Sequence, residues 1–320
     1  MKFKLKKISG DASFREFYRL KKNNRSSIII FAKKEKFKNL AVYTAINNLL
    51  NNNRINAPKL LGYYYKNDMI EISDLGEKSL YHHLISKKNK LNTYKLLIKL
   101  LIKLQKIKVK KIYKFQKFKI KIPKYTLSNL HKESDLFFDW YLKYFLKNRK
   151  INKIKKILRS ELNKVYQKLN YKNNTFVHRD FHISNIMIHK NKLGIIDSQD
   201  AIIGNPLYDV SSIIDDVRIK LSSKLQKKLL EFYHKNSKLK NDHFKKLKND
   251  FDILSVQRNL KILGIFVRLY KRDNKDNYLK FLPYTWTLVE KRLENPALEK
   301  LKTLLHKHLP IKKFKKLNKI

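Results

Sequence analysis

Residues 176–209, FVHRDFHISNIMIHKNKLGIIDSQDAIIGNPLYD, carry the strongest indications of fold and function in this sequence. Within it, Asp180 follows a short apolar run and lies in a predicted loop. Two more apolar runs separated by a Lys-Asn-Lys turn predict a hairpin over 186–196. We expect this hairpin to hold Asn185 and Asp197 close together at one rim, with Asp180 opposite them.

These three residue types are the ones that a phosphoryl-transfer site requires. An unligated carboxylate, Asp180, can accept a hydroxyl proton as that hydroxyl attacks the γ-phosphate of ATP. An amide and a carboxylate, Asn185 and Asp197, can hold Mg²⁺, which keeps waters and takes further ligands from the phosphates. Each residue alone is typical of a turn or helix cap. Their order, with the hairpin between them, favours a catalytic site.

Two histidines and a third aspartate accompany this site. His178 and His182, at i and i+4, could indicate a zinc pair, but no third ligand is evident. We interpret His178 as a buried brace of the loop. Asp209 follows Gly204-Asn205-Pro206 and suits the start of a helix, so we interpret it as a structural brace too.

Composition excludes several classes of protein. Hydrophobic residues make up 42% of the 320 residues, which argues against wholesale disorder. The chain has no cysteine, no apolar segment of membrane-spanning length and no apolar region after its basic start. These features favour a cytoplasmic protein without disulfides or a membrane span.

The charge is extreme, with 75 Lys and Arg against 26 Asp and Glu, a formal net charge of +49. The lysines are spread along the whole chain and accompany abundant Asn and Ile, as an AT-rich coding sequence would produce. A nucleic-acid binder concentrates its basic residues on one face. We therefore expect no specific nucleic-acid partner.

The order of predicted elements indicates an α+β protein with two lobes. Strands over 2–33, with a small-residue turn at 9–13, precede an amphipathic helix over 37–53 and a strand pair over 60–72. We expect an antiparallel-sheet lobe at 1–73. A mostly helical lobe follows at 74–310 and a basic tail at 311–320.

Within the helical lobe, apolar spacing predicts helices over 80–85, 93–107, 133–146, 151–169, 207–217, 224–234 and 242–270, with a further helical segment between Pro283 and Pro296. The basic segment 108–123 is predicted to be a loop. Glu133, Asp135 and Asp139 lie in an acidic and aromatic helix, which is conspicuous because acidic residues are scarce in this chain.

Several motifs together resemble the aminoglycoside phosphotransferase-like superfamily, which is related to protein kinases, and within it the bacterial anomeric kinases of N-acetylmuramate and N-acetylglucosamine. The matching segments are Gly10-Asp11-Ala12-Ser13-Phe14-Arg15, Ser73-Asp74-Leu75-Gly76, 136–141, His178-Arg179-Asp180-Phe181-His182 with Asn185, Asp197 with Gln199-Asp200-Ala201, and 257–266. The resemblance covers nearly the whole chain. It implies a protein-kinase-like two-lobe fold, an ATP- and Mg²⁺-dependent sugar kinase, and a role in cell-wall sugar recycling.

The resemblance also implies two groups of binding residues. Nucleotide contacts are expected from Gly10, Asp11, Ala12, Ser13, Phe14, Arg15, Lys33, Glu71, Ile72, Ser73 and Asp74, the last four through backbone groups near adenine. For the sugar, whose hydroxyls suit carboxylates, we expect Glu133, Asp135, Asp139, Gln199 and Asp200. These residues fit equally well as helix caps and a solvated face.

Two features depart from the family pattern. Ser198 stands where a Phe is usual, and 37–53 contains no Glu to pair with Lys33. Two other functions remain open. One is a phosphotransferase for an aminoglycoside or choline-like alcohol. The other is a non-catalytic kinase-like or basic nucleic-acid-binding protein, against which the intact Asp180, Asn185 and Asp197 argue.

Overall fold

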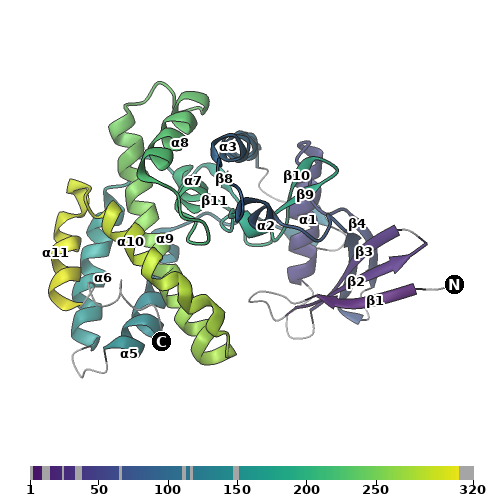
Figure 1. The fold of residues 1–320 in the computed structure, drawn as a ribbon, viewed down its shortest axis with the longest axis horizontal. Helices are drawn as coiled ribbons and strands as arrows, with labels where there is room; N and C mark the ends of the chain where they lie inside the picture. The colour runs from purple at the N-terminus through teal and green to yellow at the C-terminus, as the bar shows by residue number, and fades with distance from the viewer. Residues whose placement is uncertain are drawn as a thin grey trace. The chain divides into compact units, whose positions relative to one another are not determined.

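The computed structural model describes residues 3–8, 15–23, 25–32, 38–64, 67–109, 113–115, 118–146 and 151–309. Its contacts divide the chain into two compact units (Figure 1). The first comprises Met1–Lys90, Lys103–Pro123 and His178–Ile202, and the second Leu91–Ile102, Lys124–Val177 and Ile203–Ile320. The lobe boundaries predicted from the sequence stay a prediction, and the tail 311–320 lies outside the described residues.

The first unit is built on a five-stranded antiparallel sheet with the strand order β1-β2-β3-β5-β4. Its strands are β1 (Phe3–Ile8), β2 (Glu16–Lys22), β3 (Arg25–Phe31), β4 (Leu60–Tyr64) and β5 (Met69–Ser73). The tight β2–β3 turn begins at Asn23, whose φ of +46° is one that Asn tolerates better than most residues.

Helix α1 (Lys38–Asn52) covers this sheet with its apolar face. Leu40 and Tyr43 of α1 form one buried cluster with Ile30 of β3 and Ile70 and Ile72 of β5. The apolar residues of α1 recur every three or four positions, so one side of the helix meets the alternating apolar side chains of the strands.

A short hairpin corrects the prediction of a loop over 108–123. Strands β6 (Tyr113–Phe115) and β7 (Phe118–Ile120) pair in antiparallel register. Their apolar residues alternate with lysines and pack against Ala41 and Ala45 of α1. The lysine-rich composition hid a period-two pattern that only becomes stable against a partner helix.

The first unit also contains helix α2 (Leu80–Leu84), the single turn η3 (Ile183–Asn185) and a second hairpin. That hairpin consists of β9 (Ile186–His189) and β10 (Lys192–Ile195), as predicted. Its two-residue turn, Lys190 and Asn191, has φ angles of +47° and +58°, which match the twist that hairpin turns require.

The second unit is mostly helical. It contains the larger part of α3 (Leu91–Gln105), followed by α4 (Leu127–Leu136), the π-helical segment η2 (Phe137–Leu142), α5 (Lys143–Phe145), α6 (Ile151–Gln167), α7 (Leu207–Ile214), α8 (Ser223–Asn236), α9 (Phe244–Asp273), η4 (Asp276–Phe281), α10 (Leu282–Arg292), η5 (Pro296–Leu298) and α11 (Glu299–His308). Two short strands, β8 (Thr175–Val177) and β11 (Ile202–Gly204), complete the described elements.

Helix α9 is a long helix of the second unit, and most of its 30 residues are buried. At Gly264 it touches the backbone where α4 gives way to η2. A Cβ at Gly264 would lie 2.3 Å from the carbonyl carbon of Leu136 and 2.6 Å from Phe137 N, so only glycine permits this approach. The fold confirms the predicted α+β class, with an antiparallel sheet first and a mostly helical remainder. Among the described residues, no helix has the length and apolarity to cross a membrane.

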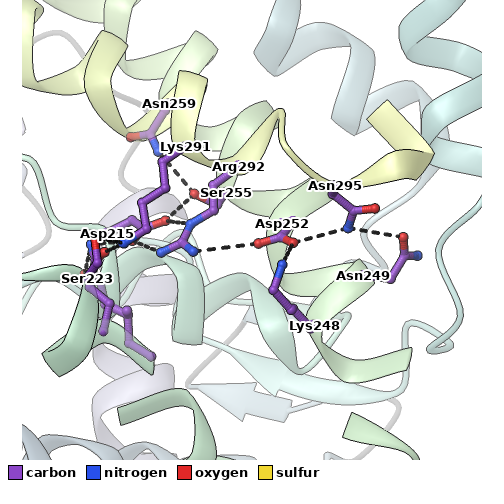
Figure 2. A network of polar contacts seen from close by, with 12 residues as sticks. Asp215, Ser223, Lys248, Asn249, Asp252, Ser255, Asn259, Lys291, Arg292 and Asn295 are labelled. Atoms are coloured by element: carbon purple, nitrogen blue, oxygen red, sulfur yellow. Dashed lines mark hydrogen bonds and ion pairs between the residues drawn. The ribbon is translucent and has the colours of Figure 1, made fainter. Parts of the chain in front are cut away.

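A buried ionic network joins α7, α9 and α10 (Figure 2). The Arg292 guanidinium donates from Nε and Nη2 to both carboxylate oxygens of Asp215, at 2.8 and 2.7 Å. Its Nη1 lies 3.7 Å from Asp252 Oδ1. Both carboxylates are fully buried, and Ser255 and Asn295 donate further hydrogen bonds to them. Buried charges are tolerated when opposite charges and hydrogen bonds compensate them in this way.

We expect the Arg292→Ala substitution to lower the free energy of unfolding by about 3–5 kcal/mol, because it leaves Asp215 buried without its cation and leaves Asp252 with Lys248 alone. Urea denaturation followed by circular dichroism measures the loss. The control is Arg272→Ala, which removes an exposed pair with the adjacent Asp273 and should cost at most about 1 kcal/mol. Equal losses in the two variants would contradict the importance of the network.

Candidate active site

The Asp180 loop is fastened by hydrogen bonds to its own backbone. The carbonyl oxygen of Asp180 accepts from His182 N at 3.0 Å and from Asn185 Nδ2 at 3.1 Å. Arg179, immediately before it, has a φ of +76°, which costs energy for a residue with a Cβ. The tight loop leaves the Asp180 side chain half-buried rather than enclosed.

The β9–β10 hairpin then brings Asp197 back to Asn185. Ile196 N donates to the carbonyl oxygen of Asn185 at 3.0 Å, so the two ends of the hairpin meet. Asp197 follows directly and, like Arg179, has a positive φ, +65°. The structure thus brings Asp180, Asn185 and Asp197 into one connected segment, and strained backbone of this kind concentrates at functional sites.

Electrostatics set Asp197 apart from an ordinary surface carboxylate. Burial and the nearby charge of Asp180 raise its pKa to about 6, against the opposing effects of a hydrogen bond from Gln199 and the charge of Arg15. The Gln199 Nε2 donates to Asp197 Oδ1 at 2.9 Å. Two neighbouring carboxylates in a partly buried site repel each other unless a cation lies between or beside them.

The donor set therefore fits a divalent cation such as Mg²⁺. The hydrogen bonds of the Asn185 amide, to Asp180 O and His182 Nε2, both involve Nδ2, so its Oδ1 is oriented for another partner. Asp197 offers a carboxylate whose charge is poorly compensated by the protein. Hard cations prefer such oxygen ligands, and Mg²⁺ commonly uses only one or two of them from the protein.

Ser198, which departs from the family pattern, has a defined role in packing. Its side chain is completely buried, and its Oγ donates to Asn47 Oδ1 of α1 at 2.7 Å. A hydroxyl at this position ties the residue after Asp197 to α1 by a hydrogen bond, where an aromatic ring would act through apolar contact. Nothing in the sequence indicates Asn47 as the partner.

His178 and Asp209 are both buried, at 0% and 1% exposure. Burial lowers the pKa of His178 to about 4, although Asp180 and backbone groups act in the opposite direction, so its imidazole is neutral at pH 7. Asp209 lies in the first turn of α7, where Asn205 provides the capping oxygen by accepting from Leu207 N at 2.9 Å. The bracing roles of His178 and Asp209 stay predictions.

The residues expected to contact nucleotide are only partly described. Gly10, Asp11, Ala12, Ser13, Phe14 and Lys33 lie outside the described residues. Arg15 is described, and its positive charge acts on Asp197. Glu71, Ile72 and Ser73 end β5, where Ser73 N is already bonded to Lys59 O at 2.8 Å. Asp74 is the first residue beyond the sheet.

Arg19, which was not predicted as a functional residue, holds the Asp74 side chain in place. Arg19 of β2 donates from Nε to Asp74 Oδ2 at 2.6 Å, and from Nη2 to Gly76 O at 2.9 Å. Burial alone would raise the pKa of Asp74, but hydrogen bonds from Arg19, Ser26 and Gly76 N outweigh it and lower the pKa. The importance of Arg19 could not be predicted from the sequence, because nothing there distinguishes it from the many other basic residues of the chain.

The acidic residues expected at the sugar are all paired. Glu133 is buried, and Lys261 Nζ donates to its Oε1 at 3.1 Å. Asp135 accepts from Arg159 Nε at 3.0 Å, and Asp139 from Lys155 Nζ at 2.7 Å. Gln199 and Asp200 follow Asp197 in the first unit, where Asp200 lies 3.8 Å from Arg179 Nη1. Their roles at the sugar stay predictions.

The three-dimensional arrangement defines a kinase-like phosphotransferase fold. An ethanolamine kinase from Plasmodium vivax superposes with a TM-score of 0.62 and 16% identity, covering 94% of this chain and 84% of its own. The ADP-bound aminoglycoside phosphotransferase APH(2'')-Ib gives a TM-score of 0.59 and 15% identity, covering 92% of this chain and 93% of its own.

Sequence comparison identifies the family. The model of the phosphotransferase enzyme family matches residues 4–244, and the chain belongs to this family. The N-acetylmuramate/N-acetylglucosamine kinase of Pseudomonas aeruginosa is 28% identical, over 92% of this chain and 86% of its own. The protein of the same name from Neisseria meningitidis is 25% identical, over 88% of this chain and 83% of its own. The resemblance noted from the motifs is thereby confirmed.

We expect Ser198 and Asn47 to be energetically coupled. Ser198→Ala and Asn47→Ala should each lower the free energy of unfolding by about 1–3 kcal/mol, because each leaves a buried polar partner unsatisfied. The double variant should lose less than the sum, by about 1 kcal/mol, in a double-mutant cycle followed by urea denaturation. Ser134→Ala is the control, since it removes a buried hydroxyl that donates to the Leu130 and His131 carbonyl oxygens of its own helix. Strict additivity would contradict the coupling.

Proposed function

We infer that this enzyme transfers the γ-phosphate of ATP to a hydroxyl of an amino sugar, namely the anomeric hydroxyl of N-acetylmuramate or N-acetylglucosamine. The observation that carries the proposal is the connected Asp180–Asn185–Asp197 segment, in a chain whose curated relatives bear the name of that kinase. The cytoplasmic location and the part in cell-wall sugar recycling stay predictions.

Each residue of the segment has one role in the proposal. Asp180, half-buried and held by backbone hydrogen bonds, accepts the proton of the sugar hydroxyl as its oxygen attacks phosphorus. Asn185 and Asp197 hold Mg²⁺ through oxygen atoms. When bound, Mg²⁺ neutralises charge on the phosphates of ATP. Gln199 orients the Asp197 carboxylate by its hydrogen bond to Oδ1.

The nucleotide is proposed to lie against the first unit. The backbone after Ser73 is the proposed contact for adenine, because β5 is hydrogen-bonded to strands on both sides up to that residue. Arg19 supports this part of the chain by bonding Asp74 and Gly76 O. The turn 9–13 and Lys33 remain the predicted phosphate contacts.

The pairing of the acidic cluster favours a sugar over a cationic acceptor. An aminoglycoside or a choline-like alcohol would require free carboxylates to balance its charge. Glu133, Asp135 and Asp139 are instead neutralised by Lys261, Arg159 and Lys155. The acidic cluster of Glu133, Asp135 and Asp139, which a cationic acceptor would need free, is therefore engaged in ion pairs within the protein.

We expect Asp180→Asn to lower kcat by about 10²–10⁴-fold, because an amide cannot accept the hydroxyl proton. Binding of ATP with Mg²⁺, measured by calorimetry, should stay within about threefold of the unsubstituted enzyme, since Asn185 and Asp197 are intact. Turnover is followed with ATP and a panel of sugars and amino alcohols, and the phosphorylated carbon is assigned by NMR.

The control for this experiment is Glu231→Gln, an exposed carboxylate that is paired with Lys227 one turn earlier in α8. It should leave kcat unchanged. An unchanged kcat in Asp180→Asn would show that Asp180 does not accept the hydroxyl proton. Phosphorylation of an amino alcohol, and of no sugar, would overturn the proposed acceptor.

A further inference from the structure

Arg19 of β2 binds the segment that follows β5 through all three nitrogen atoms of its guanidinium group. Its Nε donates to Asp74 Oδ2 at 2.6 Å, and its Nη2 donates to Asp74 Oδ1 at 3.2 Å and to Gly76 O at 2.9 Å. Its Nη1 donates to Glu77 Oε1 at 2.9 Å. Arg19 is 9% exposed, so its bonds to Asp74 and Gly76 are largely shielded from water. A fork of donors fixes the orientation of the groups that it binds.

Two further hydrogen bonds fix the Asp74 carboxylate. Ser26 Oγ of β3 donates to Asp74 Oδ2 at 2.6 Å, and Gly76 N donates to Asp74 Oδ1 at 2.8 Å. Gly76 has a φ of +99°, a conformation that residues with a Cβ rarely adopt. The conformation of residues 74–76, here called the clamped segment, is therefore set by two strands of the sheet and by its own turn.

Leu75, in the middle of the clamped segment, has backbone groups available to a ligand. Among the described residues its N–H and C=O form no hydrogen bond, and the flanking Asp74 and Gly76 are partly exposed. Backbone groups in folded proteins are normally paired, so a donor and an acceptor left together on one residue suggest a ligand. The edge of adenine offers the complementary pair, an amino donor beside a ring-nitrogen acceptor.

The side chain of Leu75 packs against the β9–β10 hairpin, which leads to the proposed Mg²⁺ ligands. A Cβ at Gly194 of β10 would lie 2.8 Å from Leu75 Cδ1. Just beyond the clamped segment, Lys78 O accepts from Ile188 N of β9 at 3.5 Å. Arg19, the clamped segment and this hairpin all belong to the first unit. The segment is thus held by the sheet on one side and by the hairpin on the other.

We propose that Arg19 is a positioning residue for the nucleotide, which holds the clamped segment so that the Leu75 N–H and C=O bind the edge of adenine. This inference rests on the proposed function, in which the nucleotide lies against the first unit. Arg19 acts through Asp74 and Gly76 O rather than by touching the nucleotide. A segment that is ordered before the base arrives costs little to organise on binding, so the clamp sets both the affinity for adenine and the preference for it over other bases.

The test measures the binding of Mg·ADP and Mg·IDP by calorimetry. IDP carries a carbonyl oxygen and a ring N–H where ADP carries the amino group and the ring nitrogen, so it cannot form the same pair of bonds. In Arg19→Gln the Kd of ADP should rise about 10- to 100-fold, because a segment that adopts the held conformation only about 1–10% of the time binds correspondingly weakly. The Kd of IDP should change by at most about threefold, since IDP does not use the held conformation.

Three further variants separate positioning from general stabilisation. Arg19→Lys should recover part of the affinity for ADP, because an ammonium group can pair with Asp74 but lacks the fork that also reaches Gly76 O. Arg19→Gln and Asp74→Asn combined should weaken ADP binding by less than the product of their separate effects, since one acts through the other. The matched control is Arg25→Gln, an exposed arginine of the adjacent strand β3, which should change neither nucleotide.

Binding of nucleotide does not depend on which acceptor is phosphorylated. Selective loss of ADP affinity in Arg19→Gln supports the positioning role, even if no sugar is phosphorylated and the proposed acceptor is wrong. Equal weakening of both nucleotides, or no preference for ADP in the unsubstituted protein, overturns it. Absence of nucleotide binding overturns both this inference and the proposed function. If thermal denaturation shows that Arg19→Gln is unfolded, Arg19→Lys, which keeps the positive charge, is compared by the same criteria.

Discussion

A backbone hydrogen bond from Ile196 N to Asn185 O closes the open end of the β9–β10 hairpin, and the candidate site is built around it. The Lys190-Asn191 turn sets the register of the two strands through its positive φ angles. A slip of one residue would turn alternate side chains to the opposite face and separate Asn185 from Asp197. Asp197, which follows the closing hydrogen bond, has a positive φ of its own, a backbone conformation that costs energy.

Acidic residues are scarce in this protein, and most of the buried ones form ion pairs. With 26 acidic residues against 75 basic ones, carboxylates are used where burial makes pairing necessary. Arg292 pairs with Asp215 and Asp252, Lys261 pairs with Glu133, and Arg19 pairs with Asp74. Against this background, a charged group that is buried and poorly compensated is informative. Asp197 is such a group.

Much of the element order was predictable because its signals are local. The sheet strands, α1 and the β9–β10 hairpin follow from apolar periodicity and Asn-containing turns. The helix predicted from residue 133 begins instead at Leu127, after a capping box made by Thr126 and Asn129 that periodicity alone does not reveal. The β6–β7 hairpin was missed because its apolar residues are separated by lysines and are stabilised by α1.

The catalytic candidates could be named from the sequence, since Asp180, Asn185 and Asp197 fall within one short run whose spacing and turn bring them together. The hydrogen-bond partners of the buried polar side chains follow only from the tertiary structure. Asn47 meets Ser198 across 151 residues, Arg19 meets Asp74 across 55, and Gln257 meets Glu133 across 124. Sequence cannot show that Arg292 pairs with Asp215, because a buried charge acquires its partner only when distant helices pack together.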